Sequence, residues 1–411
     1  MPDPSPALDV VVIGGGAAGL TAAVFAARAG ADALVVEKTR QGGKKIVVSG
    51  GGRCNVLPSA SDAGLFVTGS SPRLLRRILE SWPLRDQRDF FEHDLGIPLA
   101  LEPETGKLFP ASNRATDVRD RLVDAARQSG AGFRFSTTVA RLDPAPGGWR
   151  IGLGDGSEVR ARAVVVATGG LSVPKTGSDG WGLALAERTG HRVEPTYAAL
   201  APLTATPAPH ADLAGVSVPD AYVRVPQGRG AFSTSGGFLF THRGYSGPAV
   251  LNVSHLTALG RARGDSPPVE VRWTEQSADA WHDALTEPGR GLVATTLRAT
   301  LPARLADRLM QDADVPADRA RADLRRDERL RLIESLTAYR VPWTGDEGYK
   351  KAEVTGGGVA LSEVHTGTLE SRHRPGLYFA GEVLDAFGPI GGYNFQWAWA
   401  TGRLAGLAAA G

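Results

Sequence analysis

The chain has 411 residues, and its 46 lysines and arginines nearly balance its 44 aspartates and glutamates. A formal net charge of +2 gives no bulk reason to expect a nucleic acid or a strongly acidic partner. The single cysteine, Cys54, excludes internal disulfides and cysteine zinc clusters. The 52 glycines are nearly double the usual share of about 7% and require a local explanation.

The first residues of the chain carry no targeting signal. Segment 1–8 lacks the basic and apolar regions of a signal peptide. The best apolar stretch, 17–27, is cut by Arg28 and is shorter than the ~20 residues that a membrane helix needs. We therefore expect a cytoplasmic protein with no membrane contact, either a monomer or a homodimer.

The first elements form one supersecondary unit. Residues 9–13 (DVVVI) are typical of a buried parallel strand, and the glycine-rich turn 14–19 follows directly. An alanine-rich helix is predicted over 20–29, and a second strand over 33–36 ends at Glu37. The order is strand, glycine turn, helix, strand and acidic residue, which is the order found in dinucleotide-binding folds.

Each glycine of the turn has a physical role in this motif. Gly14 permits the tight turn, Gly16 lets backbone amides approach a pyrophosphate, and Gly19 allows close helix–strand packing. The start of the helix then offers unpaired N–H groups to the phosphates. Glu37 can accept hydrogen bonds from ribose hydroxyls, and its charge would repel a 2′-phosphate, so NADP is not expected in this turn.

A second glycine concentration lies at residues 41–56 (QGGKKIVVSGGGRCNV). Its loop has little steric bulk, and Lys44, Lys45 and Arg53 supply positive charge for a pyrophosphate or an anionic reduced flavin. Cys54 is either a reactive thiol or a buried small apolar residue. Because it has no second cysteine and no neighbouring histidine, the buried interpretation is favoured.

The middle of the chain changes character several times. Helices are predicted at 72–80, 86–95 and 115–128, and strands at 132–143, 148–153, 158–163 and 164–167. The stretch 193–271 is punctuated by proline and glycine and suggests a small β-rich domain. The stretch 278–340 is helical, and its arginines at 319–331 alternate with acidic residues, which favours a salt-bridged surface over an RNA-binding one.

The end of the chain decides between FAD and NAD. Residues 164–170 (VVVATGG) and 376–382 (GLYFAGE) are two further strands that end in glycine. This pattern is found in flavoproteins with two dinucleotide folds and is absent from nicotinamide dehydrogenases. Glu382 is placed to bind ribityl hydroxyls, and the amides of a helix that starts near Tyr393 can stabilise negative charge at the flavin edge. A plain helix cap with a glycine loop is the alternative.

These observations predict an α/β fold. It contains a two-dinucleotide-binding, Rossmann-like FAD domain with β-barrel-like and helical insertions. The expected boundaries are residues 1–192 for the first part of the FAD domain, 193–275 for the β-rich insert, 276–348 for the helical insert and 349–411 for the C-terminal part of the FAD domain.

Six motifs, in order along nearly the whole chain, carry a specific resemblance. They are Gly14–Gly19, Ser49–Asn55 (SGGGRCN), Ala167–Ser178 (ATGGLSVPKTGS), Gly244–Asn252 (GYSGPAVLN), Gly356–Val359 and Gly376–Gln396. The chain resembles the BaiN/RdsA-type NAD(P)/FAD-dependent oxidoreductases, also labelled aminoacetone oxidase family FAD-binding enzymes. The resemblance implies the inserts named above and an FAD site. Together with the residues discussed above, the expected FAD contacts are Gly14, Gly16, Ala17, Ala18, Gly19, Glu37, Lys38, Lys44, Arg53, Cys54, Asn55, Val139, Thr168, Gly169, Gly381, Glu382, Gly391, Gly392, Tyr393, Asn394 and Phe395.

The function predicted from these patterns is that of an FAD-dependent oxidoreductase. Hydride passes through the flavin between NAD(P)H and a small unsaturated, carbonyl or amine substrate. No second GxGxxG unit is present, so NAD(P)H is expected to bind transiently. No side chain is assigned a catalytic role, and the histidines show no metal-ligand spacing. Two alternatives stay open: a tRNA-modifying flavoprotein, and a non-catalytic flavin-binding redox sensor.

Overall fold

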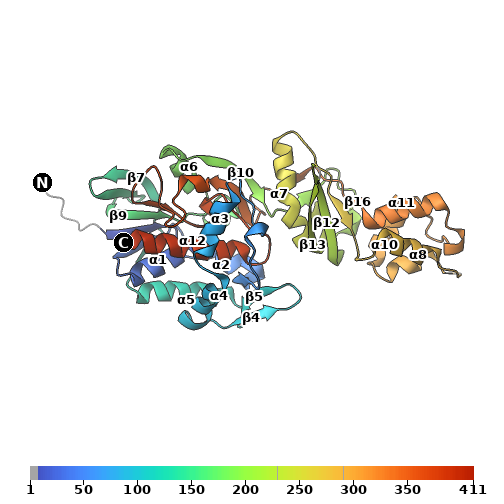
Figure 1. Cartoon of the computed structure of the whole chain (residues 1–411), viewed down its shortest axis with the longest axis horizontal. Helices are drawn as coiled ribbons and strands as arrows, with labels where there is room; N and C mark the ends of the chain where they lie inside the picture. The colour runs from blue at the N-terminus through green and yellow to red at the C-terminus, as the bar shows by residue number, and fades with distance from the viewer. Residues whose placement is uncertain (1–7, 229, 290) are drawn as a thin grey trace. The chain divides into compact units, whose positions relative to one another are not determined.

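The computed structural model describes residues 8–228, 230–289 and 291–411. These divide into two compact units (Figure 1). Unit 1 comprises the described residues up to Thr196 together with Val354–Gly411, and unit 2 comprises Tyr197–Glu353. The chain therefore begins unit 1, builds unit 2 and then returns to complete unit 1.

A seven-stranded sheet forms the centre of unit 1. Its strands are β1 (Leu8–Ile13), β2 (Ala33–Val36), β6 (Gly132–Arg134), β7 (Val139–Ala145), β8 (Gly148–Leu153), β9 (Glu158–Val166) and β19 (Leu377–Phe379). β1 lies between β2 and β9 and runs parallel to both, and β19 runs parallel to the end of β9. The β-branched runs of β1 and β9 are fully buried, as expected for parallel strands that are covered on both faces.

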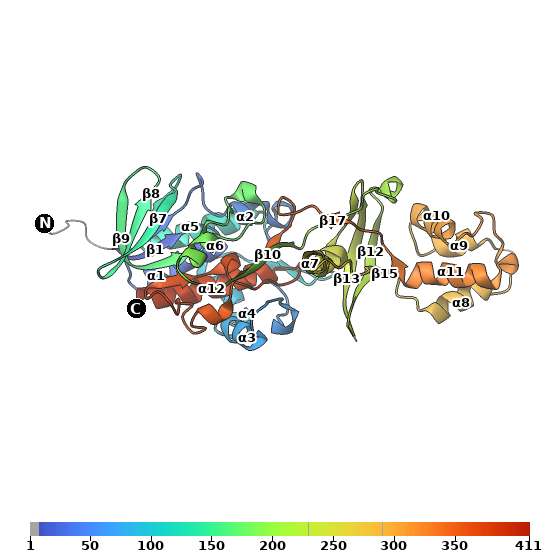
Figure 2. The same ribbon diagram turned by 90° about the horizontal axis from the view of Figure 1, so that it is seen from above.

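Two long helices, α1 (Ala17–Arg28) and α12 (Tyr393–Ala410), pack side by side against this sheet (Figures 1 and 2). Their close approach depends on Gly402 and Gly406, because a Cβ atom at either position would collide with the carbonyl oxygen of Ala18 or Ala22, respectively. The other helices of unit 1 are α2 (Lys44–Val48), α3 (Pro72–Glu80), α4 (Leu84–Asp89), α5 (Ala115–Gln128) and α6 (Trp181–Arg188).

Short strands complete unit 1. β3 (Leu57–Pro58), β5 (Lys107–Pro110) and β4 (Leu99–Glu102) form a three-stranded sheet, and β10 (Val193–Ala199) pairs with β18 (Val354–Val359). Single helical turns lie at Ser49–Gly52, Ala63–Leu65, Phe90–Asp94, Pro174–Thr176, Leu361–Glu363 and Gly381–Val383.

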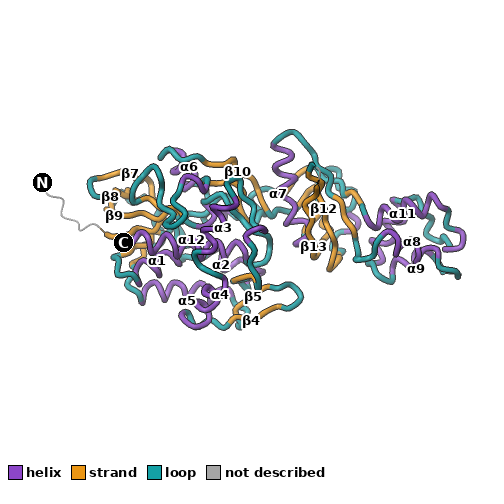
Figure 3. Tube along the Cα trace, viewed as in Figure 1, coloured by secondary structure: helices purple, strands orange, loops and turns teal. Residues whose placement is uncertain are grey.

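Unit 2 combines a second sheet with a helical cluster, as the strands and helices of Figure 3 show. The sheet order is β16 (Tyr339–Arg340), β15 (Glu270–Arg272), β12 (Ser217–Gln227), β13 (Gly230–Thr241), β14 (Gly244–Ser246), β11 (Leu203–Thr204) and β17 (Gly345–Asp346). Helix α7 (Pro248–Ala262) packs on β12 and β13. The helical cluster is α8 (Ala278–Thr286), α9 (Val293–Arg298), α10 (Ala303–Asp312) and α11 (Arg326–Thr337), and it shares a core with Phe238, Phe240 and Trp273 of the sheet side.

The predicted α/β, Rossmann-like fold class is confirmed, and the bounds of several predicted elements are wrong: the strand predicted at 132–143, for example, is divided into β6 and β7. The strands predicted at 158–163 and 164–167 form one strand, β9, because its first half pairs with β8 and its second half with β19. The helix predicted at 86–95 is α4 followed by a π-helical turn, Phe90–Asp94. The stretch 193–271, predicted as β-rich, also contains helix α7, which is buried on much of its surface and therefore lacks an amphipathic period.

Among the described residues, no helix combines the length and the apolar character needed to cross a membrane.

Candidate functional site

The glycine turn between β1 and α1 leaves the start of the helix open. Gly14 has a φ of 101°, and a Cβ atom at Gly19 would collide with the carbonyl oxygen of Gly14. At Gly16, in contrast, a Cβ atom would meet nothing within 4 Å. The described hydrogen bonds include none from the backbone amides of Ala17, Ala18 and Gly19, and no side chain caps the helix. These amides thus form an open donor set of the kind that binds phosphate.

Glu37 lies beside this turn, at the end of β2. Its two carboxylate oxygens accept hydrogen bonds from the amides of Gly15 and Thr39, both at 2.7 Å, and the residue is 8% exposed. Each carboxylate oxygen has a further lone pair for a ligand hydroxyl. Segment 136–139 runs alongside, since the amide of Thr137 donates to the carbonyl of Glu37, and this places Val139 near the same edge.

A second open helix start lies at α12. Gly391 and Gly392 precede it with φ values of 132° and 94°, and no side chain caps it. The described hydrogen bonds include none from the amides of Tyr393, Asn394 and Phe395. The side chain of Asn394 is used differently, because it accepts from the amide of Gly388 at 2.9 Å and donates to its carbonyl at 3.0 Å.

The two open helix starts are held at a fixed offset. Gly402 packs on Ala18 and Gly406 on Ala22, so α1 and α12 run in the same direction. The N-terminal end of α12 therefore extends past the N-terminal end of α1 by about two turns. This offset is roughly 12 Å at 1.5 Å per residue. Two amide donor sets separated in this way suit a ligand with a phosphate group at one end and an electron-rich group at the other.

Glu382 lies close to both helices in a partly buried polar network. Its carboxylate pairs with Lys45 at 2.5 Å and accepts hydrogen bonds from Ser172 at 2.5 Å and from the hydroxyl of Thr355 at 2.8 Å. Burial raises the pKa of Glu382, but the Lys45 ammonium and these hydroxyl groups hold the pKa below its usual range. Gly381, with a φ of 80°, donates its amide to Thr401 of α12.

The loop 49–55 flanks the start of α12. Asn55 accepts from the amide of Gly392 at 2.9 Å and donates to the carbonyl of Leu57 at 3.1 Å. Arg53 lies over the ring of Phe109 at 4.0 Å and pairs with Glu102. Cys54 is fully buried, and burial raises its pKa to about 12 against the opposing effect of a Ser49 hydrogen bond. The thiol is therefore protonated and inaccessible.

The remaining predicted residues lie around the same site with different surroundings. Lys38 pairs with Asp179 at 2.7 Å, and Lys44 is exposed at the first position of α2. Thr168 follows β9, and its buried hydroxyl has no hydrogen-bond partner among the described residues. Gly169 has a φ of 71°. No group of three or more His, Cys, Asp or Glu residues in the described chain has the arrangement of a metal site.

Ser172, Thr355 and Asp385 were not predicted as site residues. Asp385 is buried and accepts hydrogen bonds from the hydroxyls of Ser70, at 3.0 Å, and Thr68, at 3.1 Å. Burial raises its pKa, although these hydrogen bonds oppose the shift. The available signal was positional: Ser172 and Asp385 lie within the family motifs, and Thr355 directly precedes the glycines at 356–358.

Proteins of known activity match this chain over nearly its whole length. The model of the HI0933-like protein Rossmann domain matches residues 8–408. The chain is 36% identical over 399 residues to the ribosomal RNA dihydrouridine synthase of Escherichia coli, covering 96% of each chain. It is 33% identical over 407 residues to the 3-dehydro-bile acid delta(4,6)-reductase of Clostridium scindens, covering 97% of this chain and 98% of the relative.

Among solved structures, the 3-ketosteroid-delta4-(5alpha)-dehydrogenase of Rhodococcus jostii is similar with a TM-score of 0.53. The match covers 100% of this chain and 98% of that chain at 16% identity, and it shows a shared fold. The family match and the full-length relatives show that this chain belongs to the HI0933-like Rossmann family of FAD-dependent oxidoreductases.

Proposed function

We propose that unit 1 binds FAD along the line joining the two open helix starts. The amides of Ala17, Ala18 and Gly19 bind the pyrophosphate, and Glu37 binds the adenosine ribose. The amides at the start of α12 face the flavin edge, and the ribityl chain spans the interval that Gly402 and Gly406 fix. The open Cβ position of Gly16, beside unused amide donors, is the observation that best supports this fit.

FAD, when bound, supplies hydride transfer at flavin N5. We propose that the hydride comes from NAD(P)H and goes to a carbon–carbon double bond conjugated with a carbonyl group. The support is chemical: forming dihydrouridine from uridine and reducing a 3-dehydro-delta(4,6) bile acid both saturate such a bond. The start of α12 suits this reaction, because its amides stabilise negative charge that develops on the flavin edge after reduction.

The substrate class divides into two candidates. One is a small α,β-unsaturated carbonyl compound, in line with the bile acid reductase. The other is a uracil base within RNA, which is favoured by 36% identity over 96% of the chain to the dihydrouridine synthase. Both candidates need the same flavin chemistry in the same site.

Anaerobic stopped-flow spectroscopy tests the proposal. Purified holoprotein is reduced with NADH or NADPH and then mixed with an unsaturated ketone, uridine monophosphate or a uridine-containing RNA. We expect bleaching of the flavin absorbance by a reduced nicotinamide and its recovery with at least one acceptor. A protein that is reduced but recovers only with oxygen would be a redox sensor or an oxidase, and one that takes up no FAD would contradict the site itself.

A further inference from the structure

The exposed face of α3 carries three arginines without carboxylate partners. Arg73, Arg76 and Arg77 are all exposed, and the ion pairs among the described residues include none of them. The opposite face, Leu75, Ile78 and Leu79, is buried. The spacings of three and four residues place the three guanidinium groups on one side of a nine-residue helix.

This arrangement is electrostatically unfavourable for the folded chain alone. Arg73 stands in the first turn of α3, where the helix dipole favours acidic residues, and that turn has none. Arg76 and Arg77 lie three and four residues further on, so that like charges neighbour each other. Glu80, four residues after Arg76 and three after Arg77, is the one carboxylate of α3, so this helix keeps an excess of two positive charges that an anionic partner can neutralise.

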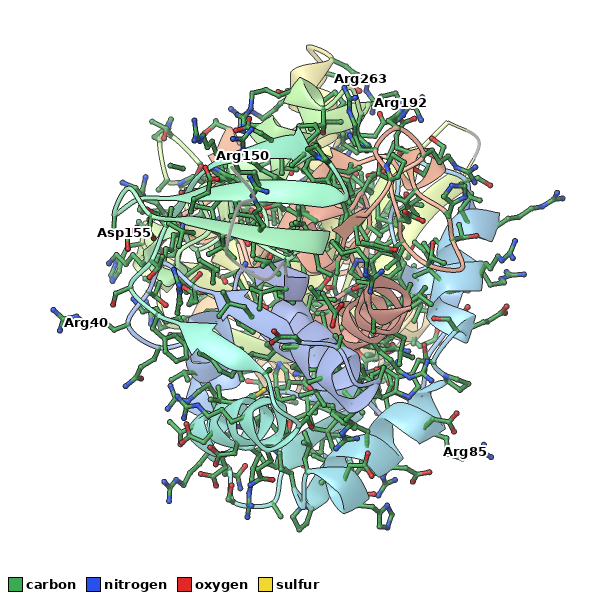
Figure 4. The ribbon with its side chains drawn as sticks, turned by 90° about the vertical axis from the view of Figure 1, so that its left-hand side faces the viewer. Arg40, Arg85, Arg150, Asp155, Arg192 and Arg263 are labelled. Atoms are coloured by element: carbon green, nitrogen blue, oxygen red, sulfur yellow. The ribbon has the colours of Figure 1, made fainter. Side chains whose placement is uncertain are left out.

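Several arginines of unit 2 form ion pairs. In the helical cluster of unit 2, Arg319 pairs with Glu328 at 2.8 Å and Arg331 with Asp327 at 3.1 Å. Other exposed cations of unit 1 are dispersed, as Arg40 and Arg85 show in Figure 4. The net charge of the whole chain is small, but α3 carries a local excess of positive charge.

α3 lies beside the flavin end of the proposed FAD site. Just before it, Val67 forms a two-way backbone bridge with Phe387, and Ser70 donates to Asp385. Phe66 contacts the ring of Tyr393, the first residue of α12, with ring centroids 5.9 Å apart. α3 itself packs on α12 (Figures 1 and 2). The N-terminal end of α3, where Arg73 stands, therefore lies near the open start of α12.

We infer that Arg73, Arg76 and Arg77 bind the phosphodiester backbone of an RNA substrate. This inference rests on the proposed function, with a base in RNA as the hydride acceptor. A base that enters the site remains linked to phosphates on both sides, and guanidinium groups at the rim bind those phosphates while leaving the base free. Contacts with phosphates carry no sequence information, so we expect this face to position the RNA without reading its sequence.

The test compares two triple variants of the holoprotein. In R73Q/R76Q/R77Q the α3 face is neutralised. In R121Q/R134Q/R188Q three other exposed arginines of unit 1, also absent from the described ion pairs, are neutralised, so the net charge changes equally. Binding of a fluorescein-labelled, uridine-containing single-stranded RNA is followed by anisotropy between about 50 and 200 mM KCl. FAD absorbance and thermal unfolding confirm that both variants are folded and loaded.

If all three arginines contact phosphates, the slope of log K against log [KCl] falls by about 2 for the α3 variant, at ~0.7 per contact on a single strand. The affinity for RNA at low salt falls at least tenfold in the α3 variant. The control variant keeps most of the wild-type affinity and most of the wild-type slope. An equal effect of both variants, or a wild-type protein that does not bind RNA, overturns the inference. A loss confined to NADPH binding also overturns it, because the face would then bind the phosphate groups of the reductant instead of an RNA backbone.

Flavin reoxidation by a small unsaturated ketone separates this inference from the proposed function. We expect it to be unchanged in the α3 variant, because these arginines lie outside the proposed FAD contacts. If the α3 variant loses RNA affinity as expected but no unsaturated acceptor reoxidises the flavin, the RNA-binding inference is supported and the proposed reaction is contradicted. If an unsaturated acceptor reoxidises the flavin but the α3 variant binds RNA as the wild type does, the proposed reaction is supported and the RNA-binding inference is contradicted.

Discussion

The hydroxyl of Tyr245 donates a hydrogen bond of 2.8 Å to Nδ1 of His210 in the interior of unit 2, where both side chains are almost completely buried. The direction of this hydrogen bond follows from the carboxylate of Asp312, at the other end of the same chain of hydrogen bonds. The carboxylate of Asp312 accepts from Tyr339 at 2.6 Å, and Tyr339 in turn accepts from Nε2 of His210 at 2.8 Å. Burial raises the pKa of Asp312, but the nearby His210 ring and the hydrogen bonds from Tyr339 and Arg308 lower it to about 2 overall. This carboxylate therefore stays an acceptor.

Replacing Tyr245 by phenylalanine should destabilise unit 2. The substitution leaves Nδ1 of His210 without its donor in a closed site, and a buried polar atom without a partner costs about 1–3 kcal/mol. Tyr222→Phe is the matched control, because that hydroxyl bonds to Glu275 at the surface, and we expect a change within about 0.5 kcal/mol. Urea unfolding followed by tryptophan fluorescence measures both. Equal midpoints for the two variants would show that the buried hydrogen bond contributes nothing.

Glycine substitutions in the first turn should separate cofactor binding from folding. Gly16→Val places its side chain in open space beside the free amides, so we expect a folded protein that is purified without FAD. Gly19→Ala instead collides with the backbone of Gly14 and should lower the unfolding temperature. The flavin-to-protein absorbance ratio and thermal unfolding distinguish the two effects. Full FAD occupancy in the Gly16 variant would contradict the proposed pyrophosphate site.

Lys45→Met should destabilise unit 1 in a pH-dependent way. Removing one partner of this partly buried ion pair should lower the free energy of unfolding, because Glu382 is left charged with only its hydroxyl and amide partners. The folded-state pKa of Glu382 is depressed in the wild type, so its ionised form stabilises the fold above the unfolded value of about 4.3, and this contribution is lost as the pH falls through the folded pKa.

Without the ammonium, the effect of burial on Glu382 is less opposed, so its pKa rises and the carboxyl takes up a proton at a higher pH than in the wild type. The destabilisation by Lys45→Met should therefore be larger at about pH 8 than at about pH 5. The measurement is the urea midpoint at both pH values. The double variant Lys45→Met/Glu382→Gln should recover much of the loss at the higher pH. A loss that is the same at both pH values would rule out the charge argument.

Cys54 should be chemically silent in the native protein. Its side chain is fully buried, and its pKa is raised to about 12. We expect no reaction with iodoacetamide until the chain is unfolded in urea, and unchanged flavin reduction in Cys54→Ala. Stoichiometric labelling of the native protein would show that the loop 49–55 opens.

The parts of the site that the sequence could predict are local in the chain. Gly14, Gly19 and Glu37 stand at spacings that are set by a strand, a helix and a second strand. The residues that the sequence pattern marks are therefore the same residues that form the site. Glu382 was found for the same reason, since it follows a strand and a glycine. Its partners Ser172 and Thr355 come from segments 210 and 27 residues away, and no periodicity records that they converge.

The same limit applies in unit 2. Tyr245 was noted only as part of a motif, and His210 was not singled out at all. Their hydrogen-bonded chain extends to Tyr339, 129 residues beyond His210, and only the paired strands and α10 bring these groups together. Helix α7 was missed because burial on most sides removes the periodic signal on which helix prediction depends.

The pairing of α1 with α12 has a consequence for biosynthesis. The amides of α1 leave the ribosome first, but the helix that packs on Ala18 and Ala22 follows only after the whole of unit 2. At ~5–20 residues per second, roughly 20–70 s separate the two. During that time the buried faces of β1 and α1 lack their final cover. FAD can thus bind at full strength only after translation of the last helix, and a nascent chain stalled within unit 2 should be recognised by chaperones as unfinished.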